Sequence, residues 1–237
     1  MERGNKWPKA IFYDSKNTLF DWYPLWIKAS SNILKRYESG IDAEEFWKRW
    51  KHFHIGSGCR TAFGKYREFT EALQESLLDT LQHYGIHGSQ ADIKLLLDLW
   101  DEVQPFPDTL PALRKQKEIT QIFIYSNVET NYLEMMVNKL GGFRPDFLGD
   151  MQQSRSCKPS PRAYRWVLEN TQLEAADVLY CAGVQWDVQG AMAFGMKAAW
   201  LKRAHIKDEI QGVKPDYTVK NLYELTEIVE SSIRSSK

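Results

Sequence analysis

The chain has 237 residues, a length that fits one large domain or a core domain with a smaller inserted one. Its 31 basic and 31 acidic side chains give a formal net charge of zero, which argues against nucleic acid or an anionic membrane as a partner, because proteins that bind these usually carry a basic excess. The 43% of hydrophobic residues suffice for a sizeable core, and no run approaches the roughly 20 apolar residues of a membrane-spanning helix.

The first predicted element is a buried strand over residues 10–13, an apolar and aromatic run that ends at Asp14. The polar residues that follow Asp14 predict a turn. From about Trp22 to Trp100 the apolar residues recur at helical spacing instead. Helical segments are expected from Leu25 onward and at residues 43–54, 66–84 and 92–99, with a break at residues 55–58 and an exit at residues 104–107.

Beyond Thr109 the pattern alternates between strand and helix. Strands are predicted at residues 121–125, 147–148, 178–182, 197–201 and 217–219. Helices are predicted at residues 110–117, 130–140, 161–170, 187–194 and from Leu222 onward. Such alternation is typical of an α/β fold, a parallel sheet with helices on both faces. We therefore predict a core of residues 1–21 and 105–237, interrupted after its first strand by a helical domain of residues 22–104.

The cysteines Cys59, Cys157 and Cys181 match neither a zinc-site nor a disulfide spacing. We interpret them as reduced thiols and expect a cytoplasmic protein. Residues 1–6 contain no apolar stretch of the kind found in secretory leaders. Net neutrality also means that charge does not oppose association with a second copy.

Polar residues follow the predicted strands where the strands of a parallel sheet share one edge. They are Asp14, the pair Ser126-Asn127, Lys158 in a later loop, and Asp187. Each has an ordinary explanation, because Asp caps turns, Ser-Asn caps helices and most lysines are solvated. Together they predict a crevice that contains two carboxylates, a hydroxyl and an ammonium.

This order of residues resembles the haloacid dehalogenase superfamily, over nearly the whole chain. The resemblance implies a Rossmannoid core with a type C1 helical cap after the first strand. It implies that Asp14 is the nucleophile, Ser126 the hydroxyl of the second motif, Lys158 the lysine of the superfamily and Asp187 the acid of the fourth motif. Most superfamily members are Mg²⁺-dependent phosphatases with a second Asp two residues after the nucleophile, where this chain has Lys16. The fourth motif, residues 182–185, also lacks the additional acid that holds Mg²⁺.

The L-2-haloacid dehalogenase branch, which works without a metal or cofactor, matches more closely. Its motifs are matched by Asp14, Thr18, Leu19, Phe20 and Asp21, by Lys158, Pro159, Pro161 and Tyr164, and by Trp186, Asp187, Gly190 and Ala191. This chain departs from the branch at three places. The branch usually has Tyr where this chain has Lys16 and Gly where it has Asn17, and it often has Ser-x-Asn where this chain has residues 182–184. The resemblance therefore implies displacement of a leaving group from C2 of a small 2-substituted carboxylic acid, through an aspartyl ester.

The resemblance also implies roles for individual residues. Thr18 would hydrogen-bond Asp14, Lys158 would keep Asp14 ionised and aimed, and Asp187 would orient Lys158 and help to activate water. The expected substrate-binding residues are Ser15, Lys16, Asn127, Lys48, Arg49, Trp186 and Tyr164, with Tyr164 supporting Lys158. In the cap, Lys48 or Arg49 would stabilise the departing anion, with Arg60 also a candidate. Candidates for an apolar wall are Tyr23, Trp47, Phe53 and Phe63.

Alternatives remain at this stage. The leaving group can be chloride, fluoride or the amine of a strained ring, as in the related azetidine-carboxylate hydrolases. A Mg²⁺-dependent phosphatase would use the same Asp14, and a non-enzymatic binding protein would leave three buried charges idle. The resemblance further implies a homodimer formed through the cap.

Overall fold

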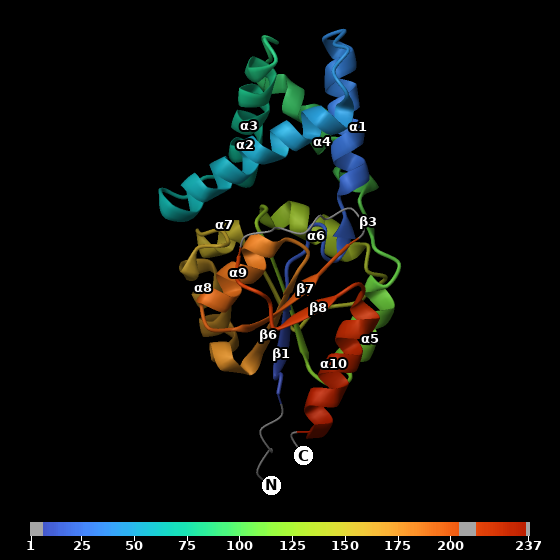
Figure 1. The fold of residues 1–237 in the computed structure, drawn as a ribbon, viewed down its shortest axis with the longest axis vertical. Helices are drawn as coiled ribbons and strands as arrows, with labels where there is room; N and C mark the ends of the chain where they lie inside the picture. Colours follow the sequence, from blue (N-terminus) through green and yellow to red (C-terminus); the bar gives the residue numbers. More distant parts are fainter. Residues whose placement is uncertain (1–6, 204–211, 236–237) are drawn as a thin grey trace.

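The computed structural model describes residues 7–203 and 212–235, so the prediction made for residues 1–6 lies outside the described residues. A parallel sheet runs through the middle of the molecule in the strand order β5-β4-β1-β6-β7-β8 (Figure 1). Its strands are β1 (Ala10–Tyr13), β4 (Gln121–Ser126), β5 (Phe147–Asp150), β6 (Val178–Ala182), β7 (Lys197–Leu201) and β8 (Tyr217–Val219). Because β1 pairs with both β4 and β6, the first strand of the chain occupies the middle of the sheet.

Helices cover both faces of the sheet, and side chains alternate between the faces along each strand. On β1, Phe12 packs edge-on against Tyr180, with ring centroids 4.9 Å apart, on the face covered by α8 (Pro161–Thr171) and α9 (Gln185–Ala193). Tyr13 points to the opposite face, where its hydroxyl donates to Gln116 of α5 (Thr109–Lys117). The remaining core helices are α6 (Thr130–Asn138), α7 (Met151–Ser154), η3 (Ala175–Asp177) and α10 (Leu222–Ser235).

A group of helices stands beyond the carboxyl edge of the sheet, at the top of Figure 1, and we call it the helical insert. It contains α1 (Tyr23–Arg36), α2 (Ala43–Phe63), α3 (Phe69–His83), α4 (Lys94–Leu97) and the short 3₁₀ helices η1 (Gln90–Ile93) and η2 (Trp100–Glu102). Strand β2 (Phe20–Asp21) pairs antiparallel with β3 (Gln104–Pro105). This pairing holds side by side the two segments that connect the core with the helical insert. The predicted α/β fold with helices inserted after the first strand is confirmed.

The predicted helix break at residues 55–58 is wrong, because α2 continues through them to Phe63. Ser57 and Thr61 are buried on successive turns, and the Thr61 hydroxyl donates to the Ser57 carbonyl at 3.1 Å. Each of the two glycines costs roughly 1 kcal/mol relative to Ala in a helix. Packing of the buried face outweighs that cost, so the long helix reaches past the edge of the insert (Figure 1).

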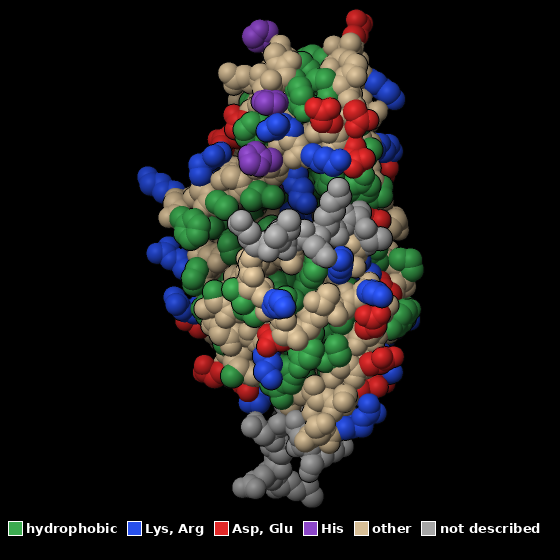
Figure 2. All heavy atoms as spheres, in the orientation of Figure 1, with side chains coloured by type: hydrophobic (Ala, Val, Ile, Leu, Met, Phe, Trp, Pro, Cys, Tyr) green, Lys and Arg blue, Asp and Glu red, His purple; other side chains and the backbone are tan. Residues whose placement is uncertain are grey.

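Acidic and basic side chains are interspersed over the visible face of the molecule (Figure 2). That distribution matches the equal numbers of acidic and basic residues in the sequence. Among the described residues, no helix is both long enough and apolar enough to cross a membrane.

Candidate active site

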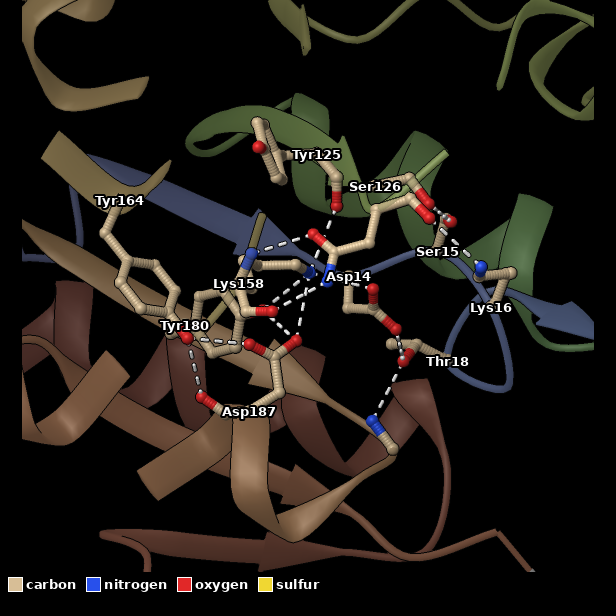
Figure 3. A network of polar contacts seen from close by, with 12 residues as sticks. Asp14, Ser15, Lys16, Thr18, Tyr125, Ser126, Lys158, Tyr164, Tyr180 and Asp187 are labelled. Carbon is tan, nitrogen blue, oxygen red and sulfur yellow. Dashed lines mark hydrogen bonds and ion pairs between the residues drawn. The ribbon is translucent and has the colours of Figure 1, made fainter. Parts of the chain in front are cut away.

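Four polar side chains meet at the carboxyl edge of the sheet, as the sequence predicts (Figure 3). Asp14 directly follows β1, and its backbone N–H donates to Cys181 of the neighbouring strand β6. Ser126 is the last residue of β4, and Asp187 lies in the first turn of α9. Lys158 comes from the loop between α7 and α8, which brings it back over the sheet. The crossing connections of a parallel sheet thus bring together residues that lie far apart in the sequence.

The Asp14 carboxylate is held through both of its oxygens. Lys158 Nζ donates to Oδ1 at 2.8 Å, and the predicted hydrogen bond from Thr18 reaches Oδ2 at 2.9 Å. The Thr18 oxygen in turn accepts the backbone N–H of Gly183 at 2.8 Å, so its own proton is directed at Asp14. Asp14 is 6% exposed. These contacts give a buried carboxylate one orientation, which is what a nucleophile requires.

Lys158 links the two carboxylates. Its Nζ lies 2.8 Å from Asp14 and 2.9 Å from Asp187, and it also donates to the Tyr125 carbonyl and the Tyr180 hydroxyl. Burial disfavours the charge, but Asp14 and Asp187 outweigh that effect and raise the pKa of Lys158 above its ordinary value. Lys158 is therefore an ammonium ion that pairs with both carboxyl groups.

The hydroxyl groups of two tyrosines donate hydrogen bonds to the Asp187 carboxyl group. Tyr164 donates to Oδ1 at 2.7 Å, and Tyr180 donates to Oδ2 at 2.5 Å. Burial raises the pKa of Asp187, while Lys158 and the two phenols oppose that rise. The buried hydroxyl of Tyr164 contacts Asp187, which pairs with Lys158, so Tyr164 reaches Lys158 through Asp187, and it is not among the described residues that line the cavity described below. Tyr180 was missed, since nothing in a buried strand sequence marks one Tyr as a hydrogen-bond donor to a distant acid.

A cavity of about 130 Å³ lies in front of Asp14, between the sheet edge and the helical insert. Lys16, Asn127, Trp186 and Asp187 line it, as expected, and the described lining is completed by Asn17, Trp26, Trp47, Lys51, His54, Ile55 and Val184. Ser15 and Ser126 are fully buried and lie beside it, where the Ser15 hydroxyl donates to the Ser126 oxygen at 2.5 Å. The Asn127 side chain hydrogen-bonds both backbone groups of Lys158 at 2.8 Å and so positions the lysine loop.

Comparison with known proteins places this arrangement in a family. A family model described as haloacid dehalogenase-like hydrolase matches residues 8–195. The chain belongs to this family. Haloacetate dehalogenase H-2 of Moraxella sp. (strain B) is 27% identical over 215 residues, which cover 89% of this chain and 93% of the relative. The (S)-2-haloacid dehalogenase of Pseudomonas sp. (strain YL) is 25% identical over 228 residues, covering 94% and 95%.

Solved structures share the fold of this hydrolase. L-2-haloacid dehalogenase from Xanthobacter autotrophicus with chloropropionic acid covalently bound has a TM-score of 0.78 at 23% identity, covering 94% of this chain and 98% of that one. The putative HAD-hydrolase YfnB from Bacillus subtilis bound to magnesium has a TM-score of 0.80 at 16% identity, covering 95% and 100%.

The insert brings a different cation to the hydrolase cavity from those predicted. Lys51 lines the cavity, whereas Lys48 is 58% exposed at its side chain and pairs with Glu44 at 2.8 Å. Arg49 donates to Tyr84, and Arg60 is exposed. Neither Lys48 nor Arg49 is among the described residues that line the cavity, because their side chains contact Glu44 and Tyr84 instead.

The aromatic wall of the cavity also differs from the prediction. Of the four predicted aromatics, Trp47 is among the described lining residues; Tyr23 packs edge-on against it at 5.0 Å, and Phe63 is 79% exposed. The signal that finds Lys51 and His54 is helical spacing, since they follow Trp47 by four and seven residues.

Lys16 forms one wall of the cavity. Its Nζ donates to the Asn127 carbonyl at 3.2 Å and lies 3.6 Å from the centroid of the Phe69 ring. Burial lowers the pKa of Lys16 to about 7, although Asp14 and Glu129 favour the charged form. The cavity therefore contains a lysine that changes charge near neutral pH.

His54 faces the same space from α2. Burial and the charge of Lys16 lower the pKa of His54 to about 3, so the imidazole is neutral. Its buried Nδ1 has no hydrogen-bond partner among the described residues. The side of the cavity formed by the insert thus offers a neutral, polar atom next to apolar surfaces.

Proposed function

We propose that this hydrolase displaces a leaving group from C2 of a small 2-substituted carboxylic acid, by way of an ester on Asp14, and releases a 2-hydroxy acid. The observation that carries the proposal is the orientation of Asp14, held by Lys158 and Thr18 at the floor of a cavity of about 130 Å³. Lys16 and Lys51 supply positive charge above that floor. The names of the relatives, (S)-2-haloacid dehalogenase and haloacetate dehalogenase, support the same substrate class.

In the first step an oxygen of Asp14 attacks C2 while the leaving group departs with the bonding electrons. Water then attacks the carbonyl carbon of the ester, which regenerates the Asp14 carboxylate and releases a proton and the hydroxy acid with inverted configuration. Lys158 stabilises the carboxylate between turnovers, and Asp187, held by Tyr180, orients Lys158 and helps to activate the water. Lys16, Ser126 and the backbone N–H groups of Ser15 and Asn127 bind the substrate carboxylate.

We propose that the departing anion is stabilised by Lys51, the cation that α2 places at the cavity. Lys51 is exposed and its Nζ lies 5.4 Å from the centroid of the Trp47 ring, and Trp47 and Trp186 add apolar surface to the cavity wall beside the departing anion. A halide fits this description. An amine that leaves from a strained ring needs a proton instead, and Lys51 is also a candidate donor on the insert side.

We propose that the reaction needs no metal ion. Both carboxylates at the sheet edge are engaged with Lys158, and Lys16 stands where Mg²⁺-dependent members carry their second Asp. The loop from Gly183 to Gln185 supplies no acid either. Mg²⁺ prefers carboxylate oxygens, and an ammonium ion at that position repels it.

The test is halide release from L-2-chloropropionate and fluoroacetate in the presence of EDTA, with Asp14→Asn as the comparison. Wild-type release that is lost in the variant supports the proposal. A single turnover in ¹⁸O-labelled water adds a second readout, because ester hydrolysis at the carbonyl carbon places the label in Asp14. Release of phosphate from small phosphate esters only when Mg²⁺ is present would instead make the protein a phosphatase. Ring opening of azetidine-2-carboxylate without halide release would assign the amine leaving group.

We further propose that residues 22–104 form a cap domain on a core of residues 1–21 and 105–237, and that two caps associate in a cytoplasmic homodimer. The tight pairing of β2 with β3 at the junction supports the division. Light scattering on the purified protein tests the dimer, with a mass of 27.6 kDa expected for the single chain.

A further inference from the structure

Two cysteines lie near each other at the junction between the helical insert and the core. Cys157 is buried and directly precedes Lys158, whereas Cys59 is exposed on α2. The Cys157 thiol contacts the Gly58 carbonyl, with 3.5 Å between sulfur and oxygen. Since a peptide bond joins that carbonyl to Cys59, standard geometry puts the Cys59 Cα within about 6.5 Å of the Cys157 sulfur.

The two thiols also affect each other electrostatically. Burial raises the pKa of Cys157 to about 12, and the nearby Cys59 adds to that rise. Disulfides join Cα atoms roughly 4.4–6.8 Å apart. The Cα-to-sulfur distance leaves the two Cα atoms at most about 9 Å apart, so a rotation of the exposed Cys59 side chain and a shift of the last turns of α2 by up to about 2.5 Å bring the sulfurs into bonding distance.

We propose that Cys59 and Cys157 are an oxidative modification site, at which a small disulfide such as oxidised glutathione drives formation of a bond between α2 and the loop that carries Lys158. Neither cysteine has a part in the reaction proposed above. Cys181 is buried in β6 and lies outside this site.

The chemistry follows thiol–disulfide exchange. The Cys59 thiolate attacks one sulfur of oxidised glutathione, which forms a mixed disulfide and expels one glutathione thiolate. Cys157 then loses its proton and attacks the Cys59 sulfur, which forms the protein disulfide and expels the second glutathione. Two protein thiols are oxidised and one small disulfide is reduced to two thiols. The second step is the slower one, because the raised pKa of Cys157 leaves little thiolate at neutral pH.

The bond ties one wall of the cavity to its floor. Lys51 and His54 lie on α2, one to two turns before Cys59, and Lys158 follows Cys157 directly. The bond would fix α2 relative to the loop that carries Lys158, and we expect this to hinder the exchange of substrate and product. A loss of turnover in the oxidised protein is the expected consequence, and this part rests on the proposed function.

The first experiment needs no turnover. Reduced full-length protein is incubated with oxidised glutathione, alkylated, and digested with trypsin without reduction. Wild type is expected to lose two of its three thiols, become lighter by two hydrogen atoms, and yield residues 52–60 linked to residues 156–162. Cys59→Ser and Cys157→Ser each prevent the linked peptide, and Cys157→Ser retains glutathione on Cys59.

Two results overturn the proposal: glutathione that stays on Cys59 of the wild type at equilibrium, or linkage of Cys59 to Cys59 of a second molecule. The activity arm is read separately. Oxidised wild type is expected to lose halide release and to regain it with dithiothreitol, while Cys59→Ser keeps its rate under the same oxidant. If the protein with the Cys59–Cys157 disulfide keeps its full activity, the modification site is supported and the proposed effect on turnover is refuted.

Discussion

Replacing Lys16 with Met removes a charge from the cavity while keeping the length of the side chain. The Lys16 ammonium lies among Asp14, Glu129 and Lys158, with neutral His54 opposite, and its pKa is about 7 because burial disfavours the charge. About nine tenths of the lysine is therefore charged at pH 6 and about one tenth at pH 8. The carboxylate of a 2-substituted acid stays ionised throughout this range.

The size of the effect follows from the ion pair that only charged Lys16 can form. A hydrogen bond to a charged group contributes roughly 1.5–3 kcal/mol, which corresponds to about 10- to 150-fold in affinity. At pH 6 the kcat/KM of Lys16→Met should fall by about that factor relative to wild type. As pH rises through the pKa, wild type loses the charge as well, so the ratio between the two should approach one by about pH 9.

The assay measures kcat/KM for L-2-chloropropionate between pH 6 and 9 at constant ionic strength, for wild type, Lys16→Met and Lys16→Arg. Because Arg stays charged, its kcat/KM should not fall through the range where wild type does. Calorimetry at pH 7 adds a second readout, since binding of an anion raises the pKa of Lys16 and takes up as much as about half a proton. A ratio of wild type to Lys16→Met that is the same at pH 6 and pH 9 would refute the reasoning.

Three further changes probe neighbouring parts of the molecule. Lys51→Met should lower kcat for halide release by about 10- to 100-fold, whereas the exposed Lys48→Met should leave it unchanged; equal effects would remove Lys51 from its proposed role. Tyr180→Phe removes the hydrogen bonds of the Tyr180 hydroxyl to Lys158 and Asp187 and should lower kcat/KM roughly tenfold. An unchanged kcat/KM in a stopped-flow assay would show that these two hydrogen bonds do not contribute to turnover. Arg203→Met leaves buried Asp108 unpaired and should reduce the free energy of unfolding in urea by about 3–5 kcal/mol, a prediction that an unchanged midpoint contradicts.

The position of Asp14 at the sheet edge could be predicted from the sequence because it depends on local pattern and on one topological rule. The apolar run before Asp14 marks a buried strand, and strands that alternate with helices form a parallel sheet. Such a sheet collects its strand ends at one edge, so Asp14, Ser126 and Asp187 had to meet. Thr18 follows Asp14 by four residues, near enough for a tight turn to join them.

The side of the cavity formed by the insert could not be predicted in the same way. Which face of α2 points at Asp14 depends on how Phe46 and Trp50, both fully buried, pack against the other helices. Around the axis of that helix, Lys48 lies about 60° and Arg49 about 160° from Lys51, so the rotation of α2 decides which of the three cations faces the cavity. The helical spacing was visible in the sequence, but its phase relative to the sheet was not.

The contacts behind the catalytic carboxylates show the same division. Tyr164 and Tyr180 both read as ordinary core aromatics, and their hydroxyls became significant only when α8, α9 and β6 packed around Asp187. The contact of the Cys157 thiol with the Gly58 carbonyl joins residues that no spacing rule connects. The sequence by itself determined the elements, their order and the acid, lysine and hydroxyl at the strand ends, since these follow from local periodicity. Tertiary structure decided the cavity wall and the partners of each charge, because these depend on packing between elements that are distant in the chain.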